Sequence, residues 1–373
     1  MLHVAYNLQH AVCAYCMLHA HTPLTETGRN QRKERQMHPK TVVAIDAGRS
    51  AIKVAYKTPA ESGRFLFPSA AMVARKLSDE AEEGRAKKDT VTINNETYWV
   101  GDTAVFQRGP IASASLSDDW IESEEHAVLL LSALERVEAV KSAAGDKLIV
   151  LGLPGRQFLR QKHRLETVAK KLFNSRTTEV KVIPQPKAPF NRHLQNDDGT
   201  LAKGRSLEES YAVIDVGRYT TDLAIIVQGR FIESGLDSCA GTKGAAEKML
   251  LLMKEQGIQA NLPDAERALA RKSVMFRGEF IDLGKQAKIA LQAFEEEIMA
   301  TVTRMVDPYS ATLNGLILAG GGASFVEQPL RRVWHNIITA PGEDSRYMVA
   351  EGMARWGAGV LLARRAALSA SPA

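Results

Sequence analysis

Short apolar runs alternate with amphipathic segments along most of this chain. Continuous runs at Lys147–Leu153 and Gly315–Ala319 predict strands that are buried on both faces, as in a largely parallel sheet. Ahead of the first run, residues 126–143 carry apolar side chains at the helical period. Strands that alternate with helices indicate an α/β fold whose sheets are covered by helices.

One local pattern occurs twice, within residues 41–56 and again within residues 212–223. In each copy an apolar strand reaches an aspartate, a glycine follows two residues later, and a second strand resumes. A single Asp-x-Gly turn is a common way to close a hairpin, but two copies indicate an internal duplication. The residues that define them are Asp46, Gly48 and Ser50 in the first copy and Asp215, Gly217, Thr220 and Thr221 in the second.

The length of 373 residues exceeds one ordinary compact core, so two domains are expected. The polar segment 187–210, with its NDDG and KGRS sequences, is predicted to be a partly mobile linker loop. The predicted divisions are a leader at 1–37, a first domain at 38–186 with a β-rich insertion at about 65–125, the linker, a second domain at 211–367 with a helical insertion at about 243–305, and a tail at 368–373.

Composition limits the possible function classes. Lys and Arg total 48 against 43 Asp and Glu, and this small excess permits a polyanionic partner without requiring one. Three cysteines cannot form a disulfide framework, and no apolar run is long enough to cross a membrane, so we expect a cytoplasmic protein. Cys13 and Cys16 could hold zinc together with nearby histidines, although a disordered leader is the simpler interpretation.

The two hairpins have the residue types that a nucleoside triphosphate needs. Glycine allows a main chain to approach phosphate oxygens, hydroxyl groups add donors, and two carboxylates suit a Mg²⁺ ion held through water. Lys53 either supplies a compensating charge or is simply solvated. The candidates are Gly48, Ser50, Gly217, Thr220 and Thr221 for the phosphates, with Asp46 and Asp215 for Mg²⁺.

A third candidate is the run Gly320, Gly321, Gly322 and Ala323, which follows a predicted buried strand and precedes a predicted helix. A helix N-terminus behind such a run favours an approaching phosphate or nucleoside. The spacing matches neither the dinucleotide-binding fingerprint nor a Walker A loop. The sequence therefore predicts three segments that converge on one nucleotide.

These three motifs together resemble those of the actin-like ATPase superfamily. Residues 46–53 are similar to its first phosphate loop, 215–222 to its second, and 318–323 to its adenosine motif. The resemblance implies a duplicated actin-like (ribonuclease H-like) fold, with two domains around a nucleotide cleft and a smaller subdomain inserted in each. A narrower resemblance, to plasmid-segregation actins of the ParM/StbA kind, rests on GRSAIK ending at Lys53, YWVGDTA at 98–104, VLGLPG at 150–155 and YMVAEGMARWGAG at 347–359.

The resemblance also implies a mechanism. ATP and Mg²⁺ bind in the cleft, subunits add head to tail as a filament, and hydrolysis destabilises that filament. Many bacterial actins place a glutamate where this chain has Gln185, and a glutamine can orient water without accepting its proton, so slow hydrolysis is expected. Arg218 and Tyr219 replace small residues and could either crowd the γ-phosphate or let Arg218 contact it. The implied catalytic residues are Gln185 and Asp215, and the further nucleotide contacts are Arg49, Lys53, Arg218, Gly320, Gly321, Gly322 and Ala323.

The expected partners are further copies of the chain and a DNA-binding adaptor that is itself bound to plasmid DNA. No helix-turn-helix is evident, so direct sequence-specific DNA binding is not expected, and neither is a membrane. Two alternatives stay open. One is a small-molecule kinase of the same fold, for which only Asp222 offers a base near the second hairpin. The other is a nucleotide-gated scaffold that does not hydrolyse ATP.

Overall fold

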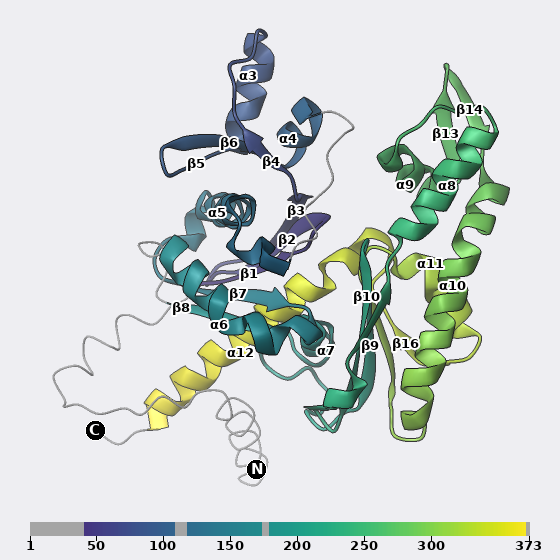
Figure 1. Ribbon diagram of the computed structural model, residues 1–373. Coiled ribbons are helices and arrows are strands. Elements are labelled where there is room, and N and C mark those ends of the chain that lie inside the picture. The colour runs from purple at the N-terminus through teal and green to yellow at the C-terminus, as the bar shows by residue number, and fades with distance from the viewer. Residues whose placement is uncertain (1–40, 109–117, 174–178, 371–373) are drawn as a thin grey trace.

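The computed structural model of the chain describes residues 41–108, 118–173 and 179–370 (Figure 1). The predicted leader, with Cys13 and Cys16, lies outside these residues. None of the helices within these ranges is long and apolar enough to span a lipid bilayer.

The first domain is built on a five-stranded sheet. An antiparallel meander continues into parallel strands, in the order β3-β2-β1-β7-β8. Alternate residues of the central strands face opposite ways: Val43 and Ile149 pack beneath α5 and α6, whereas Val42 and Val150 pack against α12. Both faces are therefore buried, as the continuous apolar runs predict. The elements are β1 (Thr41–Ala47), β2 (Ala51–Lys57), β3 (Ser62–Pro68), β7 (Lys147–Leu153), β8 (Glu179–Pro184), α5 (Glu124–Glu138), α6 (Gly155–Leu172) and α12 (Met348–Ala370).

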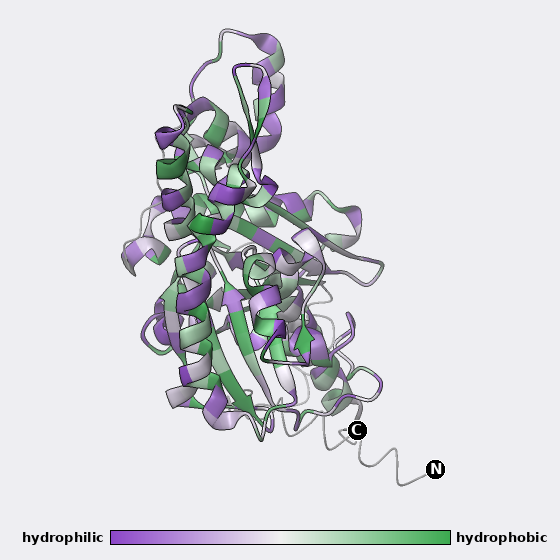
Figure 2. Cartoon of the chain, turned by 90° about the vertical axis from the view of Figure 1, so that its right-hand side faces the viewer, coloured by the Kyte–Doolittle hydropathy of each residue, from purple (hydrophilic) through white to green (hydrophobic). Residues whose placement is uncertain are grey.

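The second domain repeats this plan. Its sheet runs β11-β10-β9-β15-β16, with β12 also pairing with β10, so an antiparallel hairpin again lies beside a parallel strand. One face packs on α8, α10 and α11 and the other on α7. In Figure 2 its strands are mostly hydrophobic, and the helices in front carry hydrophilic positions. The elements are β9 (Tyr211–Val216), β10 (Thr220–Val227), β11 (Arg230–Phe231), β12 (Asp237–Ala240), β15 (Gly315–Ala319), β16 (Ile337–Ile338), α7 (Lys187–Leu194), α8 (Lys243–Glu255), α10 (Gly284–Val306) and α11 (Ala323–Arg331).

Each domain carries a smaller insertion, and both insertions lie at the same end of the molecule in Figure 1. In the second insertion the sequence predicted only helices and missed a hairpin, because its strands have four residues each. In the first, Asn94 and Asn95 form the hairpin tip with positive φ. The elements are β4 (Ala71–Val73), β5 (Thr90–Ile93), β6 (Glu96–Val100), α3 (Glu80–Ala86) and α4 (Gly101–Arg108) in domain I, and α9 (Leu262–Arg271), β13 (Ser273–Phe276) and β14 (Glu279–Asp282) in domain II.

The predicted linker loop at 187–210 is wrong over its first third, where the chain forms helix α7. This helix connects the domains: Ala188 belongs to the core beneath α12, and Phe190 and Leu194 belong to the core of the second sheet. The sequence gives no clear signal for this helix, because it is short and has no side-chain N-cap. Burial between the two domains stabilises it instead. Helix α12 also continues to Ala370, past the predicted end of the second domain at 367.

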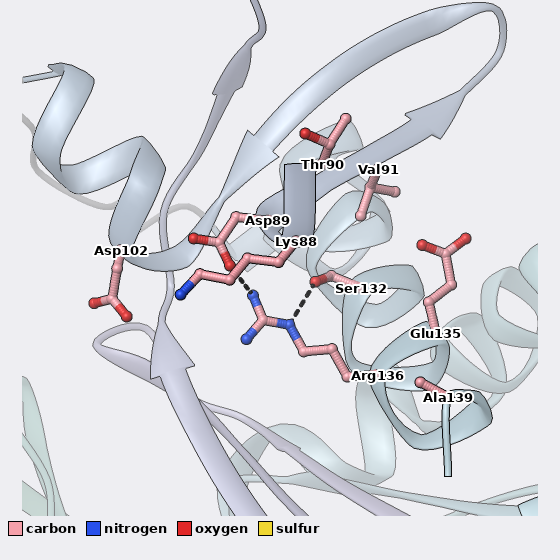
Figure 3. A pocket seen from close by; sticks show the side chains of 9 residues that line it. All are labelled: Lys88, Asp89, Thr90, Val91, Asp102, Ser132, Glu135, Arg136 and Ala139. Atoms are coloured by element: carbon pink, nitrogen blue, oxygen red, sulfur yellow. Dashed lines mark hydrogen bonds and ion pairs between the residues drawn. The ribbon is translucent and has the colours of Figure 1, made fainter. Parts of the chain in front are cut away.

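A buried ion pair holds the domain I insertion on α5 (Figure 3). Asp89, only 4% exposed, accepts hydrogen bonds from Arg136 Nη2 at 2.8 Å and Thr103 Oγ1 at 2.6 Å. The Arg136 guanidinium lies 4.3 Å from the Phe67 ring, and its Nε donates to Ser132 Oγ at 3.3 Å. The Asp89 carboxylate therefore connects α4 and α5 directly, and β3 contacts the same arginine.

Replacing Asp89 by alanine is expected to lower the free energy of unfolding by about 3 kcal/mol, because a partly buried guanidinium loses its counter-charge. Urea unfolding followed by tryptophan fluorescence measures the loss. The matched control is Glu82→Ala, which breaks the more exposed pair with Arg85 and should cost under about 1 kcal/mol. Equal losses of unfolding free energy in the two variants would contradict the conclusion that Asp89 holds the insertion on α5.

Candidate functional site

A cleft of about 750 Å³ lies between the two domains, where the two Asp-x-Gly hairpins come together. It is bounded by residues far apart in the sequence: both hairpins, the end of β8 and the glycine run after β15. Twelve of the predicted site residues line it: Asp46, Gly48, Arg49, Ser50, Lys53, Gln185, Asp215, Gly217, Arg218, Thr220, Gly320 and Gly321.

The two hairpins are equivalent in register. Asp46 lies opposite Lys53 in the first, and Asp215 lies opposite Asp222 in the second. In the second hairpin a glycine closes the turn: Gly217 N donates to the Thr220 carbonyl at 2.9 Å, and a Cβ at Gly217 would lie 2.7 Å from that oxygen. The tight turn by itself therefore requires glycine at position 217, whether or not a phosphate binds there.

Asp46, Gln185 and Lys53 form one hydrogen-bonded group in the cleft. Gln185 Nε2 donates to Asp46 Oδ1 at 2.6 Å, and Lys53 Nζ donates to Asp46 Oδ2 at 3.0 Å. In the described part of the chain no protein donor to Gln185 Oε1 is recorded, so this atom can accept a hydrogen bond from a water molecule. The group can thus orient water from a fixed position.

Gly152 makes room for Gln185, a role that the sequence reasoning missed. A Cβ at Gly152 would lie 2.7 Å from Gln185 Cγ, and Gln185 N donates to the Leu153 carbonyl at 2.8 Å. The available signal was a glycine inside the otherwise apolar strand β7, which often marks a close approach.

Asp215 lies at the centre of an excess of negative charge. Burial, together with the carboxylates of Asp46 and Asp222, raises its pKa to about 7, and Lys53 opposes this shift. Burial also raises the pKa of Asp222, against hydrogen bonds from Ser238 and Thr220. Among the residues that the structure describes, Lys53 is the basic side chain that lowers the pKa of Asp215, and a cation bound beside this carboxylate would lower it further.

Three predicted contacts are not brought to the cleft. The Thr221 hydroxyl is fully buried and donates to the Ala240 carbonyl at 3.0 Å, so it is no phosphate donor. Gly322 and Ala323 are packed in the protein interior and do not line the cleft. A Cβ at Gly322 would lie 2.5 Å from Val216 Cγ1, and Ala323 is 2% exposed. Because a single glycine run turns sharply into α11, only its first two residues reach the cleft.

The domain I side of the cleft also includes Trp120, His126 and Arg156, which the sequence did not single out. The Arg49 guanidinium lies 4.5 Å over the Trp120 ring, whose centroid is 4.5 Å from that of His126. Across the cleft mouth, Arg156 at the start of α6 pairs with Asp237 of β12. The helical period of residues 126–143 carried no signal that one member, His126, would line a site.

Stability is expected to fall in acid partly through His126, whose pKa burial lowers to about 4 while the Ile121 carbonyl opposes the shift. Above about pH 6.5 the imidazole is neutral in both folded and unfolded states; below it only the unfolded state takes up the proton. Between pH 6.5 and 4 the wild type should therefore lose about 3 kcal/mol more than His126→Gln. Urea titrations at several pH values test this, and parallel curves would contradict it.

Two family models match consecutive parts of the chain. The one described as "Actin like proteins N terminal domain" matches residues 44–187, and "Archaeal actin homologue MreB-like, C-terminal" matches residues 213–332. Between them they include both hairpins, Gln185 and the glycine run. The chain belongs to the actin-like proteins. The duplicated actin-like fold predicted from the sequence is confirmed.

Solved actin-like structures share this fold across most of their length. A ParM filament structure from Clostridium botulinum is 22% identical with a TM-score of 0.66, covering 86% of this chain and 99% of that one. The archaeal actin homologue Ta0583 in complex with ADP is 19% identical (TM-score 0.64; 84% and 98% covered). Bacillus thuringiensis ParM with ATP is 13% identical (TM-score 0.57; 85% and 98% covered). No curated protein matches this actin-like chain.

Proposed function

We propose that this actin-like protein is a cytoplasmic ATPase that binds ATP with Mg²⁺ in the interdomain cleft, hydrolyses it slowly and assembles head to tail into filaments. The filament would segregate or position plasmid DNA through a DNA-binding adaptor. The observation that carries the proposal is the convergence of both hairpins and Gln185 on one cleft.

The cleft residues divide into two functions. Around the phosphates, the backbone of both turns and the side chains of Ser50 and Thr220 would supply donors. Gln185 would orient the attacking water through Oε1 while its amide nitrogen stays on Asp46. Phosphoryl transfer depends mainly on positioning and electrostatics, so a glutamine without proton-accepting ability supports turnover at a low rate.

The donor set fits Mg²⁺ held through water. Both Asp46 oxygens already accept protein hydrogen bonds, so this carboxylate would reach an ion through bound water. Asp215, with its raised pKa, would gain most from a neighbouring cation. In the described ranges no three His, Cys, Asp or Glu side chains form a metal cage, which matches the few protein ligands that Mg²⁺ takes. When bound, the ion would neutralise phosphate charge.

Filament assembly is supported by resemblance to solved structures. A relative of the same fold is described as a ParM filament, and another as a non-polymerisable ParM mutant. A head-to-tail contact between copies uses two different surfaces and therefore continues into an open polymer.

Light scattering and electron microscopy of the purified protein with Mg-ATP and with Mg-ADP test the proposal. A dynamic filament gives scattering that rises with ATP and decays as phosphate is released. A rise without decay would instead support the non-hydrolysing scaffold. No polymer, together with phosphorylation of a small hydroxyl substrate, would support the kinase alternative, in which Asp222, which lines the cleft, would act as the base.

A further inference from the structure

Arg218, in the turn of the second hairpin, is held by two side chains. Its Nε lies 2.5 Å from Glu266 Oε1 on α9, and its Nη1 donates to the Tyr219 hydroxyl at 2.8 Å. The guanidinium is thereby fixed between the hairpin and the domain II insertion. The sequence left open whether Arg218 and Tyr219 crowd the γ-phosphate or let Arg218 contact it; in the structure the two side chains are hydrogen-bonded to each other.

The backbone of this turn is also fixed. The Arg218 carbonyl accepts from Lys243 N at 2.8 Å, and the Tyr219 carbonyl accepts from Gly241 N at 3.0 Å. A Cβ at Gly241 would lie 2.6 Å from the Arg218 carbonyl, so the two segments are in close contact. The backbone of Arg218 is therefore held in a defined position, and the contact with Glu266 sets the position of the guanidinium.

Arg218 retains hydrogen-bonding capacity toward the cleft. A guanidinium has five N–H groups, and the two recorded bonds use two of them. The side chain is 22% exposed and lines the cleft, as does Lys243. An arginine with unused donors beside a lysine binds phosphate groups well, because the charge-assisted bonds to phosphate are strong.

We propose that Glu266 is a positioning residue: it holds Arg218 along the domain II wall so that the remaining guanidinium donors bind the polyphosphate chain of the nucleotide. This inference rests on the proposed nucleotide site. It also assigns a function to the helical insertion, because α9 would contribute to nucleotide affinity without touching the nucleotide.

The contact is expected to act on affinity and not on the chemical step. The water-orienting group, Gln185 with Asp46, belongs to domain I, whereas Arg218 is tied to domain II. A contact with the phosphate groups that do not react stabilises bound substrate and transition state alike, which lowers KM and leaves kcat unchanged.

The sign of one substitution separates positioning from simple electrostatics. Glu266→Gln removes a negative charge near the anion, which by itself would strengthen nucleotide binding. If Glu266 positions Arg218, the same change must weaken binding, because the guanidinium is no longer held. The two accounts therefore predict opposite shifts in KM.

The test measures KM and kcat for Mg-ATP hydrolysis, Kd for ATP by titration, and thermal melting in the full chain. For Arg218→Met we expect KM and Kd to rise about tenfold, and for Glu266→Gln about threefold, with kcat within about twofold and melting unchanged. The control Glu327→Gln, which breaks an arginine pair of the same kind on α11, should behave as wild type.

Unchanged or tighter ATP binding in Glu266→Gln would overturn the inference, and so would a fall in kcat at constant KM. These outcomes leave the proposed function intact, because the wild type would still bind and hydrolyse ATP. Wild-type protein that binds no nucleotide would instead overturn the proposed function itself.

Discussion

Replacing Gln185 by alanine is expected to slow ATP hydrolysis about 100-fold and to leave ATP affinity within about threefold, because the side chain orients water and does not hold the nucleotide. The physical basis is its fixed geometry: the amide nitrogen is bound to Asp46 at 2.6 Å, which leaves Oε1 for water. Single-turnover phosphate release measures the rate, and titration measures the affinity.

The matched control for this prediction is Gln328→Ala, an exposed glutamine on α11 outside the cleft. Asp215→Ala should abolish turnover, since it removes the carboxylate at the centre of the site. Full activity in Gln185→Ala together with loss in Asp215→Ala would refute the role of Gln185 and leave the site itself standing.

Replacing Gly352 by alanine is expected to cost about 3 kcal/mol of stability, at the upper end for overpacking. A Cβ there would lie 1.7 Å from the Ala188 carbonyl oxygen, and backbone cannot move aside as a side chain can. The added methyl group would push α12 away from α7. Because α7 begins two residues after Gln185, the change should also weaken ATP turnover.

Urea unfolding of Gly352→Ala and of Gly244→Ala checks this prediction. Gly244 lies within helix α8 with nothing within 4 Å of its Cβ position, so alanine there should stabilise the protein by up to about 1 kcal/mol. A Gly352→Ala variant as stable as the wild type would show that α7 and α12 can separate without cost.

The hairpins illustrate how far local pattern can be trusted. Asp46 and Asp215 were identified from strand, aspartate and glycine alone, and both line the cleft, where the Asp46 carboxylate helps to raise the pKa of Asp215. Thr221 was identified with the same logic and is turned into the core. Along a strand successive side chains point to opposite faces, so of two adjacent threonines only one can reach a ligand.

The local pattern of apolar residues and glycines determined much of the fold. A strand that is buried on both faces of a parallel sheet must be apolar throughout, and a tight turn often requires glycine. The duplicated α/β plan and both hairpins can therefore be predicted from local sequence. Helix α7 cannot be predicted in this way, because its stability comes from packing between two domains rather than from its own helix propensity.

What required the tertiary structure is the pairing of distant side chains. Gln185 with Asp46, and Arg218 with Glu266, are separated by 139 and 48 residues. No local propensity encodes such a contact: it exists only when packed sheets and helices bring the two side chains within hydrogen-bonding distance. The sequence by itself determined which residues could serve a nucleotide, and the packing of the two domains decided which of them meet.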